Sequence, residues 1–405
     1  MFFFERVHPR LSSSLDGLRW VAAGLVVVSH VRSMVLANWP QVASEHATVA
    51  MKLLYVLTSF GHQAVILFFV LSGFLVGGSV VNDIRRERFS FPLYLVNRIS
   101  RLYVVLIPAL ILGWACDVIG STWFNTSGIY THAWPQPLWA VQFNVVERMS
   151  LSVASANVFN LQTIVEPTFG SNGPLWSLAN EFWYYLLFPL CLVPWVRGRA
   201  WFVRLLCLFL AIVAGVLVYP EILLYGVVWV MGVAIRFIPR PLIPWSSASV
   251  VLTVVAMLLC VRLPHWHPGS ELIADGILAI FIANLLLTLM HHPRPASALL
   301  GGRMHSVIAD FSFSLYLLHF PMLVLLCAAS QAWLGTGLSM QPQGWLPIIF
   351  MTVVIVMLYV YAWAISLVTE RYTSVVRELL TRWFRVNNPR LAATPMEQPK
   401  PPTLP

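Results

Sequence analysis

The chain has 405 residues, of which 59% are hydrophobic and only 10% are charged, whereas soluble domains carry about 25% charged residues. Together with a mean hydropathy of +0.77, this composition excludes an ordinary soluble globular protein. A net charge of +9 is also typical of nucleic-acid-binding proteins. Here, however, the basic residues are scattered between apolar stretches instead of forming one patch. We therefore expect an integral membrane protein with no nucleic-acid partner.

The cysteines and loop histidines do not form a recognisable ligand set. Five cysteines each lie alone in an apolar segment without CxxC spacing, and the loop histidines lack a supporting cluster of acidic ligands. We expect neither a disulfide framework nor a metal site. The first apolar run contains His30 and Arg32 and lacks a small-residue cleavage site, which predicts a retained span and not a cleaved signal peptide.

Apolar runs set the expected architecture, because a spanning helix needs about 20 mostly apolar residues. The second run is longer than needed and carries Gly73, Gly77 and Gly78, so we expect it to be tilted or broken and to allow close approach of another helix. The sequence predicts an all-α polytopic membrane protein with about ten transmembrane helices. In chain order these are 16–36, 53–81, 102–120, 174–195, 200–218, 221–238, 246–263, 271–290, 306–330 and 346–368.

The distribution of basic residues predicts the orientation of the spans. An even number of spans places both termini on one side of the membrane, and Lys and Arg are enriched in cytoplasmic segments. Of the 25 Lys and Arg residues, all but Arg32, Lys52, Arg148 and Arg262 fall in or beside the segments that would share the side of the termini. We therefore expect cytoplasmic N- and C-termini.

Two segments outside the spans have a composition of their own. The longest connection, about 121–173, is expected on the outer side, where it would lie at the membrane interface or cover a site. Residues 371–405 are basic and then rich in proline, which predicts a partly disordered cytoplasmic tail after a membrane domain that covers 1–370.

Ionisable side chains inside spans are costly and are therefore candidates for function. Arg19 and His30 are eleven residues apart, which places them on one helix face about 16 Å from each other. Arg19 would lie near the cytoplasmic mouth and His30 past the midplane, an arrangement that suits a long ligand with an anionic cytosolic end and a reactive buried end. The alternative is a snorkelling arginine and a structural histidine. Further candidates in the spans are His62, Asp117 and Asp310.

Two more pairs of residues extend this picture. Arg98 and Arg101 lie at i and i+3 and could clamp phosphate groups, although ordinary cytoplasmic flanking explains them too. Glu181 enters its span from outside and His319 comes from inside, so that both are expected at the depth of His30. A carboxylate there could orient a histidine for general acid–base chemistry, with a structural buried network as the alternative.

Five short motifs occur in order along the chain. They are Leu15–Arg19 with His30 (R-x10-H), Phe68–Leu75 (FFxxSGF), Arg98–Arg101 (RxxR), Leu175–Tyr184 (LWSLxxExxFY) and Ser314–His319 (SLYLxH). Through these motifs the chain resembles, over nearly its whole length, the membrane acyltransferase-3 family, which includes O-antigen and exopolysaccharide O-acetyltransferases.

The resemblance implies a multi-pass acyltransferase of the bacterial cytoplasmic (inner) membrane. Its donor would be a cytoplasmic acyl-CoA, most often acetyl-CoA, and no metal would be needed. Its acceptor would be a hydroxyl of an envelope or exported glycan or of a lipid-linked saccharide. The lipid bilayer and polysaccharide-assembly proteins would be its further partners.

The resemblance also implies roles for the residues that match its motifs. Arg98 and Arg101, helped by Arg19, would bind the phosphates of coenzyme A. His30 would be a general base on the acceptor hydroxyl or a transient acyl carrier. Glu181 would orient or charge-balance the site, and His319 would contribute to it.

Two other classes of function fit the buried charges. A proton-coupled transporter or flippase of a glycan or lipid precursor would use midplane His and Glu residues as a proton relay. A non-catalytic scaffold of a polysaccharide-assembly complex would need none of these residues for chemistry. Acyl-CoA dependence separates the enzyme from the transporter.

Overall fold

The computed structural model describes residues 9–42, 47–135, 138, 140–196, 198–218, 220–267, 269–291 and 303–384. Every regular element among these residues is a helix, which confirms the predicted all-α class, and strand pairing is limited to two isolated bridges. The α-helices are α1 (Pro9–Val35), α2 (Val49–Leu57), α3 (Gly61–Ser72), α4 (Gly78–Arg85), α5 (Phe91–Trp123), α6 (Leu151–Val158), α7 (Leu175–Leu192), α8 (Trp201–Leu217), α9 (Glu221–Ala234), α10 (Ser246–Trp266), α11 (Glu271–His291), α13 (Arg303–Ala309), α14 (Ser312–Leu334), α15 (Leu346–Ser366) and α16 (Thr373–Trp383).

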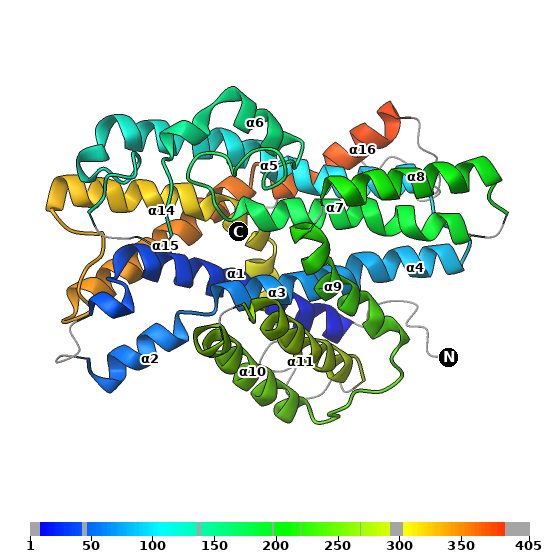
Figure 1. Ribbon diagram of the computed structural model, residues 1–405, viewed down its shortest axis with the longest axis horizontal. Helices are drawn as coiled ribbons and strands as arrows, with labels where there is room; N and C mark the ends of the chain where they lie inside the picture. The colour runs from blue at the N-terminus through cyan, green and yellow to red at the C-terminus, as the bar shows by residue number, and fades with distance from the viewer. Residues whose placement is uncertain are drawn as a thin grey trace.

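Most of the long helices run along the long axis of the molecule, and α10 and α11 pack against each other at an angle to it (Figure 1). Helices are expected in a bilayer because they satisfy the backbone polar groups within one segment. Short 3-10 helices join them: η1 (Trp39–Gln41), η4 (Asn125–Ser127), η5 (Val146–Met149), η6 (Val193–Trp195), η7 (Ile235–Phe237) and η8 (Glu370–Tyr372).

In the described part of the chain, seven helical segments are long and apolar enough to cross a membrane. Six of these segments overlap the first three predicted spans and the predicted spans at 246–263, 271–290 and 346–368. The predicted span at 306–330 is divided, because α13 ends at Ala309 and the seventh segment, α14, begins at Ser312. The other three predicted spans coincide with α7 and with the shorter apolar helices α8 and α9. The protein is thus a multi-pass membrane protein, whereas the count of ten and the side of the termini stay predictions.

The second predicted span is interrupted, as its glycines indicated. A π-helical segment, η3 (Gly73–Gly77), lies between α3 and α4 and packs on α9. A Cβ atom on Gly73 would lie 1.9 Å from the carbonyl oxygen of Trp229, and one on Gly232 would lie 2.1 Å from that of Val70. The two helices can therefore approach this closely only with glycine on both sides, as in other membrane helix pairs.

Helix α1 occupies the centre of the bundle. It packs against α3, α13, α14 and α15, and its Ala22, Ala23, Val26 and Val27 are almost fully buried. By contrast, α8 leaves Leu205, Phe209, Ile212 and Val216 exposed, an apolar face that suits contact with lipid. The central position of α1 allows both of its halves to contribute to enclosed sites.

The first part of the tail and the long connection both contain helices. The first part of the predicted 371–405 tail forms η8 and α16, and α16 packs against α5. The rest of that tail, from residue 385, lies outside the described residues. In the 121–173 connection, α6 begins after Ser150, whose side chain accepts a hydrogen bond from Val153 N and so caps the helix.

Candidate functional site

Helix α1 contributes to two separate cavities. The first, here called the Arg19 cavity, has a volume of about 330 Å³ and is lined by residues of α1, α3–α5, α7 and α14. The second, here called the His30 cavity, has a volume of about 1270 Å³ and is lined from α1, α2, α10, α14 and the segment that precedes α7. Because Arg19 and His30 are three turns apart on α1, this helix joins the two cavities.

The Arg19 cavity collects the three arginines that the sequence singled out. Arg19, Arg98 and Arg101 all line it. Arg19 Nη1 lies 3.2 Å from Asp16 Oδ1, and the Arg98 guanidinium lies 5.9 Å from the centre of the Tyr185 ring. Guanidinium groups bind phosphate groups through charge-assisted hydrogen bonds, and among the described residues only Arg19 of the three has a close ion-pair partner, Asp16.

Glu181 lies in this same cavity, and its expected place beside the histidines is wrong. Its Oε1 accepts a hydrogen bond from Ser72 Oγ at 2.6 Å and another from the Tyr185 hydroxyl, while Trp229 Nε1 donates to Ser72 Oγ at 3.1 Å. Depth along a helix fixes only the level of a side chain and leaves open which way it faces. Glu181 is thus a carboxylate in the same cavity as the three arginines, held by hydrogen bonds that Ser72 and Tyr185 donate.

His30 and His319 do meet, as predicted. His30 Nδ1 lies 2.9 Å from His319 Nε2, and the two rings stack with their centres 5.1 Å apart. His319 is fully buried, and its Nδ1 lies 2.8 Å from the carbonyl oxygen of Tyr316 and 3.1 Å from that of Leu315. Phe320 contacts His30 edge-on at 5.0 Å.

These contacts assign the tautomers of the neutral pair. A carbonyl oxygen only accepts, so His319 Nδ1 carries the hydrogen and His319 Nε2 accepts from the Nδ1–H of His30. The remaining nitrogen of His30, Nε2, then holds a free lone pair. Because His30 lines the His30 cavity, this arrangement prepares His30 to take a proton from a bound hydroxyl.

A hydroxyl pair lies in the wall of the Arg19 cavity. The Tyr316 hydroxyl on α14 lies 2.6 Å from Ser177 Oγ on α7, and Phe68 packs edge-on against the Tyr316 ring. All three residues line the Arg19 cavity, while Trp176 and Phe320, on the same two helices, line the His30 cavity. Helices α7 and α14 therefore contribute side chains to both cavities.

The segment before α7 forms part of the wall of the His30 cavity. Gly173 and Pro174 line it, and the neighbouring Ser171 N donates to the buried Asp117 Oδ2 at 2.7 Å. Asn172 Nδ2 donates to the carbonyl oxygen of Leu317 at 2.9 Å. The long connection thus contributes lining residues to the His30 cavity, and the hydrogen bond from Ser171 N to Asp117 ties it to α5. Whether it covers a site or lies at the membrane interface stays a prediction.

Other candidates have different places. His62 lines the His30 cavity, and its Nε2 lies 2.8 Å from Asp275 Oδ2. Asp275, near the start of α11, is a buried partner that sequence reasoning missed. Asp310 is exposed between α13 and α14 and lines neither cavity. No group of three or more His, Cys, Asp or Glu side chains that could hold a metal occurs among the described residues.

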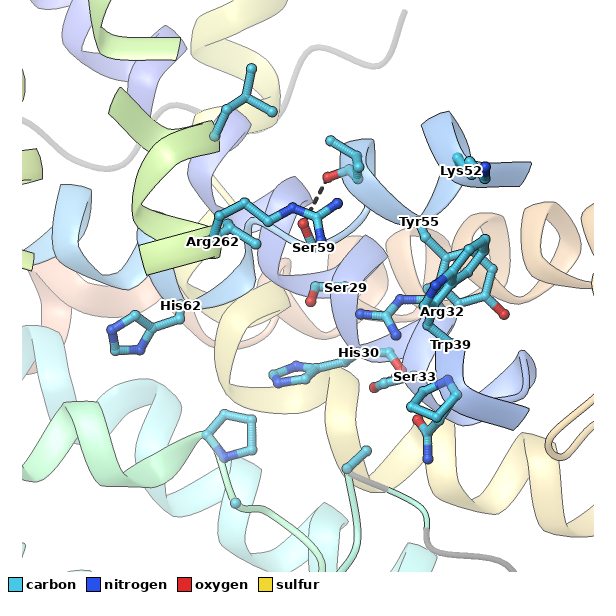
Figure 2. A pocket seen from close by; sticks show the side chains of 18 of the residues that line it. Ser29, His30, Arg32, Ser33, Trp39, Lys52, Tyr55, Ser59, His62 and Arg262 are labelled. Atoms are coloured by element: carbon cyan, nitrogen blue, oxygen red, sulfur yellow. Dashed lines mark hydrogen bonds between the residues drawn. The ribbon is translucent and has the colours of Figure 1, made fainter. Parts of the chain in front are cut away.

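The sequence reading also missed cations of the His30 cavity. Arg32, Lys52 and Arg262 line it, and Figure 2 shows the guanidinium groups of Arg32 and Arg262 directed toward its middle. In the sequence these residues stand out only because they fall on the predicted outer side, where Lys and Arg are rare. Their position on that side is the signal that could have marked them as site residues.

Comparisons with known proteins identify acyltransferases as similar to this chain. A family model described as an acyltransferase domain matches residues 12–367. The chain is 24% identical over 327 residues to the O-acetyl transferase of Shigella phage Sf6, covering 77% of this chain and 84% of the phage protein. It is 26% identical over 358 residues to the putative peptidoglycan O-acetyltransferase YrhL of Bacillus subtilis, covering 80% of this chain and 50% of that protein.

A third relative is the acyltransferase MdmB of Streptomyces mycarofaciens, which is 28% identical over 180 residues, 44% of this chain and 38% of that protein. No solved structure matches the chain.

Proposed function

The chain belongs to the membrane acyltransferase-3 family, and we propose that it moves an acyl group from a cytoplasmic acyl-CoA to a hydroxyl of an envelope or exported glycan or of a lipid-linked saccharide. Acetyl-CoA is the proposed donor and the bacterial inner membrane the proposed location. Family membership and the named acyltransferases among its relatives place the chain with the transferases, and not with the transporters or scaffolds that its buried charges also suited.

The observation that carries the proposal is the division of α1 between two chemically different cavities. Arg19 lines a cavity together with two more arginines. His30 lines a larger cavity, and the Nε2 atom of its ring carries no hydrogen. The Arg19 cavity is small for a ligand pocket, so it would hold the phosphates of coenzyme A and not the whole molecule. The acyl-bearing arm would extend past the Tyr316–Ser177 pair toward His30.

His30 acts in this proposal as a general base. Its Nε2 takes the proton of the acceptor hydroxyl as the hydroxyl oxygen bonds to the thioester carbon. The carbon–sulfur bond then breaks, and the leaving thiolate receives the proton from His30, so that an ester and free coenzyme A are formed. His319 holds the His30 ring through the Nδ1 hydrogen bond throughout.

The general-base role differs from the acyl-carrier role in one measurable respect. Direct transfer forms no acyl-enzyme, whereas a carrier histidine would hold the acyl group when acceptor is absent. Incubation of the purified protein with radiolabelled acetyl-CoA alone should therefore leave no label bound to protein. Label on wild-type protein that His30→Ala lacks would overturn the general-base step.

The test of the function itself compares envelope glycans and lipid-linked saccharides from three strains by mass spectrometry. We expect an ester-linked mass increment with the intact gene, and none with a deletion or with His30→Ala at equal abundance in the membrane. An increment that persists in the deletion would contradict the proposal. The mass of the increment identifies the acyl group, and its carrier identifies the acceptor. Polysaccharide-assembly proteins remain proposed partners.

A further inference from the structure

The cations of the predicted outer side are not spread evenly over it. The sequence leaves only four Lys or Arg residues on that side, and three of them, Arg32, Lys52 and Arg262, line the His30 cavity. They come from three different helices, α1, α2 and α10. Independent helices thus bring positive charge to one cavity in a part of the protein that otherwise contains little of it.

Arg32 is the innermost of the three. It follows His30 by two residues, and its Nε is buried without a hydrogen-bond partner among the described residues. Its guanidinium lies 5.5 Å from the centre of the Tyr55 ring. A buried donor without a partner costs free energy, which a ligand with acceptor oxygens would offset.

Lys52 and Arg262 are exposed, whereas Arg32 is only partly exposed, and Figure 2 shows Lys52 and Arg262 on different helices around the cavity. Among the described residues that line the cavity, none is acidic, so no lining carboxylate neutralises the three cations. The Asp275 carboxylate lies behind His62 and is paired with it at 2.8 Å. A cavity with unopposed positive charge attracts anions and raises their local concentration.

The same cavity carries aromatic side chains. Trp39, Tyr55 and Trp176 line it, and Trp39 contacts Tyr55 edge-on at 5.0 Å. Its volume of about 1270 Å³ exceeds that of most single-ligand pockets, which leaves room for a saccharide of several units. Aromatic faces and polar side chains suit a sugar, and the cations add a requirement for negative charge.

We propose that the acceptor is a negatively charged saccharide, which Arg32, Lys52 and Arg262 hold by a phosphate or carboxylate group while its hydroxyl lies at His30. This inference rests on the proposed acyl transfer and adds the charge of the acceptor to it. The charge comes from the phosphate of a lipid linkage or from an acidic sugar unit, and binding probes distinguish these two sources.

The binding test uses purified full-length protein and measures the rise in its thermal unfolding temperature with matched probes. Farnesyl diphosphate is compared with farnesol, and glucuronate with glucose. We expect one anionic probe to raise the unfolding temperature well above its neutral counterpart, and Arg32→Gln to weaken that binding about ten-fold. Farnesyl diphosphate as the active probe identifies a lipid-linked phosphate, and glucuronate identifies an acidic sugar.

Controls locate the binding. Arg98→Gln/Arg101→Gln, in the Arg19 cavity, should leave the probe-induced rise in unfolding temperature unchanged, because these residues do not line the His30 cavity. If this variant loses the rise, the probe binds at the proposed coenzyme A site instead. Arg32→Lys keeps the charge and should retain most of the binding. If neither anionic probe stabilises the protein more than its neutral counterpart, the inference is overturned.

The activity test uses exposed residues, whose replacement does not threaten folding. Lys52→Gln/Arg262→Gln should lower the ester content of the glycans about ten-fold, and the control Arg240→Gln/Arg377→Gln, with the same loss of charge outside both cavities, should leave it unchanged. Full ester content in the Lys52/Arg262 variant, on a neutral glycan, would overturn the inference and leave acyl transfer established. If glycans from the wild-type strain carry no ester, the proposed function itself is overturned.

Discussion

At the scale of single residues, the His30–His319 pair determines the proposed chemistry. Two backbone carbonyls fix the tautomer of His319, which in turn fixes that of His30. His319 therefore acts through His30, as a positioning residue, and need not touch the substrate.

Replacement of His319 should slow the acyl transfer step without weakening donor binding. In His319→Ala the His30 ring loses its hydrogen-bond acceptor, so we expect kcat to fall about ten-fold or more while KM for acetyl-CoA stays the same. His319→Gln, whose side-chain oxygen can accept the hydrogen bond, should retain more activity. Steady-state kinetics on protein of matched abundance checks this, and an unchanged kcat in His319→Ala would contradict it.

The arginines of the Arg19 cavity should show the opposite pattern. Arg98→Gln or Arg101→Gln removes a charge-assisted contact to the donor, so we expect KM for acetyl-CoA to rise about ten-fold with a smaller effect on kcat. Arg240→Gln, an exposed arginine outside both cavities, serves as the matched control. A normal KM in both cavity variants would exclude this cavity as the donor site.

At the scale of elements, the glycine contact between η3 and α9 holds Ser72 beside Glu181. Ser72 is the last residue of α3, and Trp229 of α9 reaches it through a hydrogen bond. π-Helical segments inside helices are often found at functional sites. Here Leu75 and Val76 of the segment line the Arg19 cavity, and the segment packs on α9.

Gly73→Ala should therefore destabilise the protein and disturb the donor site. A methyl group 1.9 Å from a backbone oxygen cannot be accommodated by a side-chain rotation, so we expect a loss of about 2 kcal/mol or more of stability. Gly215→Ala, whose added methyl group would meet no atom within 4 Å, should be neutral or slightly stabilising. Thermal unfolding of the two purified variants makes the comparison, and equal unfolding temperatures would refute the close contact.

Elements were easier to predict from sequence than the contacts between them. The ten apolar runs all correspond to helical elements, and the three glycines predicted the interruption at η3. Periodicity along one helix placed Arg19 and His30 on a common face. It could not predict which neighbouring helix the Glu181 side chain faces, or that Asp275 contacts His62. Such contacts depend on how neighbouring helices pack, which a single sequence does not specify.

At the scale of the whole molecule, the two cavities and the distribution of charge distinguish the two ends of the helix bundle. The arginine-rich end would face the cytoplasm and the donor, and the His30 cavity would face the acceptor. This arrangement rests on the predicted orientation of the termini.

Topology reporters test that orientation. We expect fusions at the C-terminus and within 82–101 to report the cytoplasm, and a fusion within 121–173 to report the opposite side, because the basic residues favour this arrangement. Reporters that place the C-terminus and the 121–173 connection on one side would contradict the odd number of spans predicted between them and the proposed direction of transfer.

The most direct test of transfer between the two cavities uses sealed membrane vesicles that contain the endogenous acceptor. Radiolabelled acetyl-CoA is added to inverted vesicles, which expose the cytoplasmic face, and to right-side-out vesicles. We predict ester-linked label on glycan or lipid-linked saccharide in inverted vesicles only, and none in either orientation with His30→Ala. Equal labelling from both faces, or labelling that survives His30→Ala, would contradict this prediction.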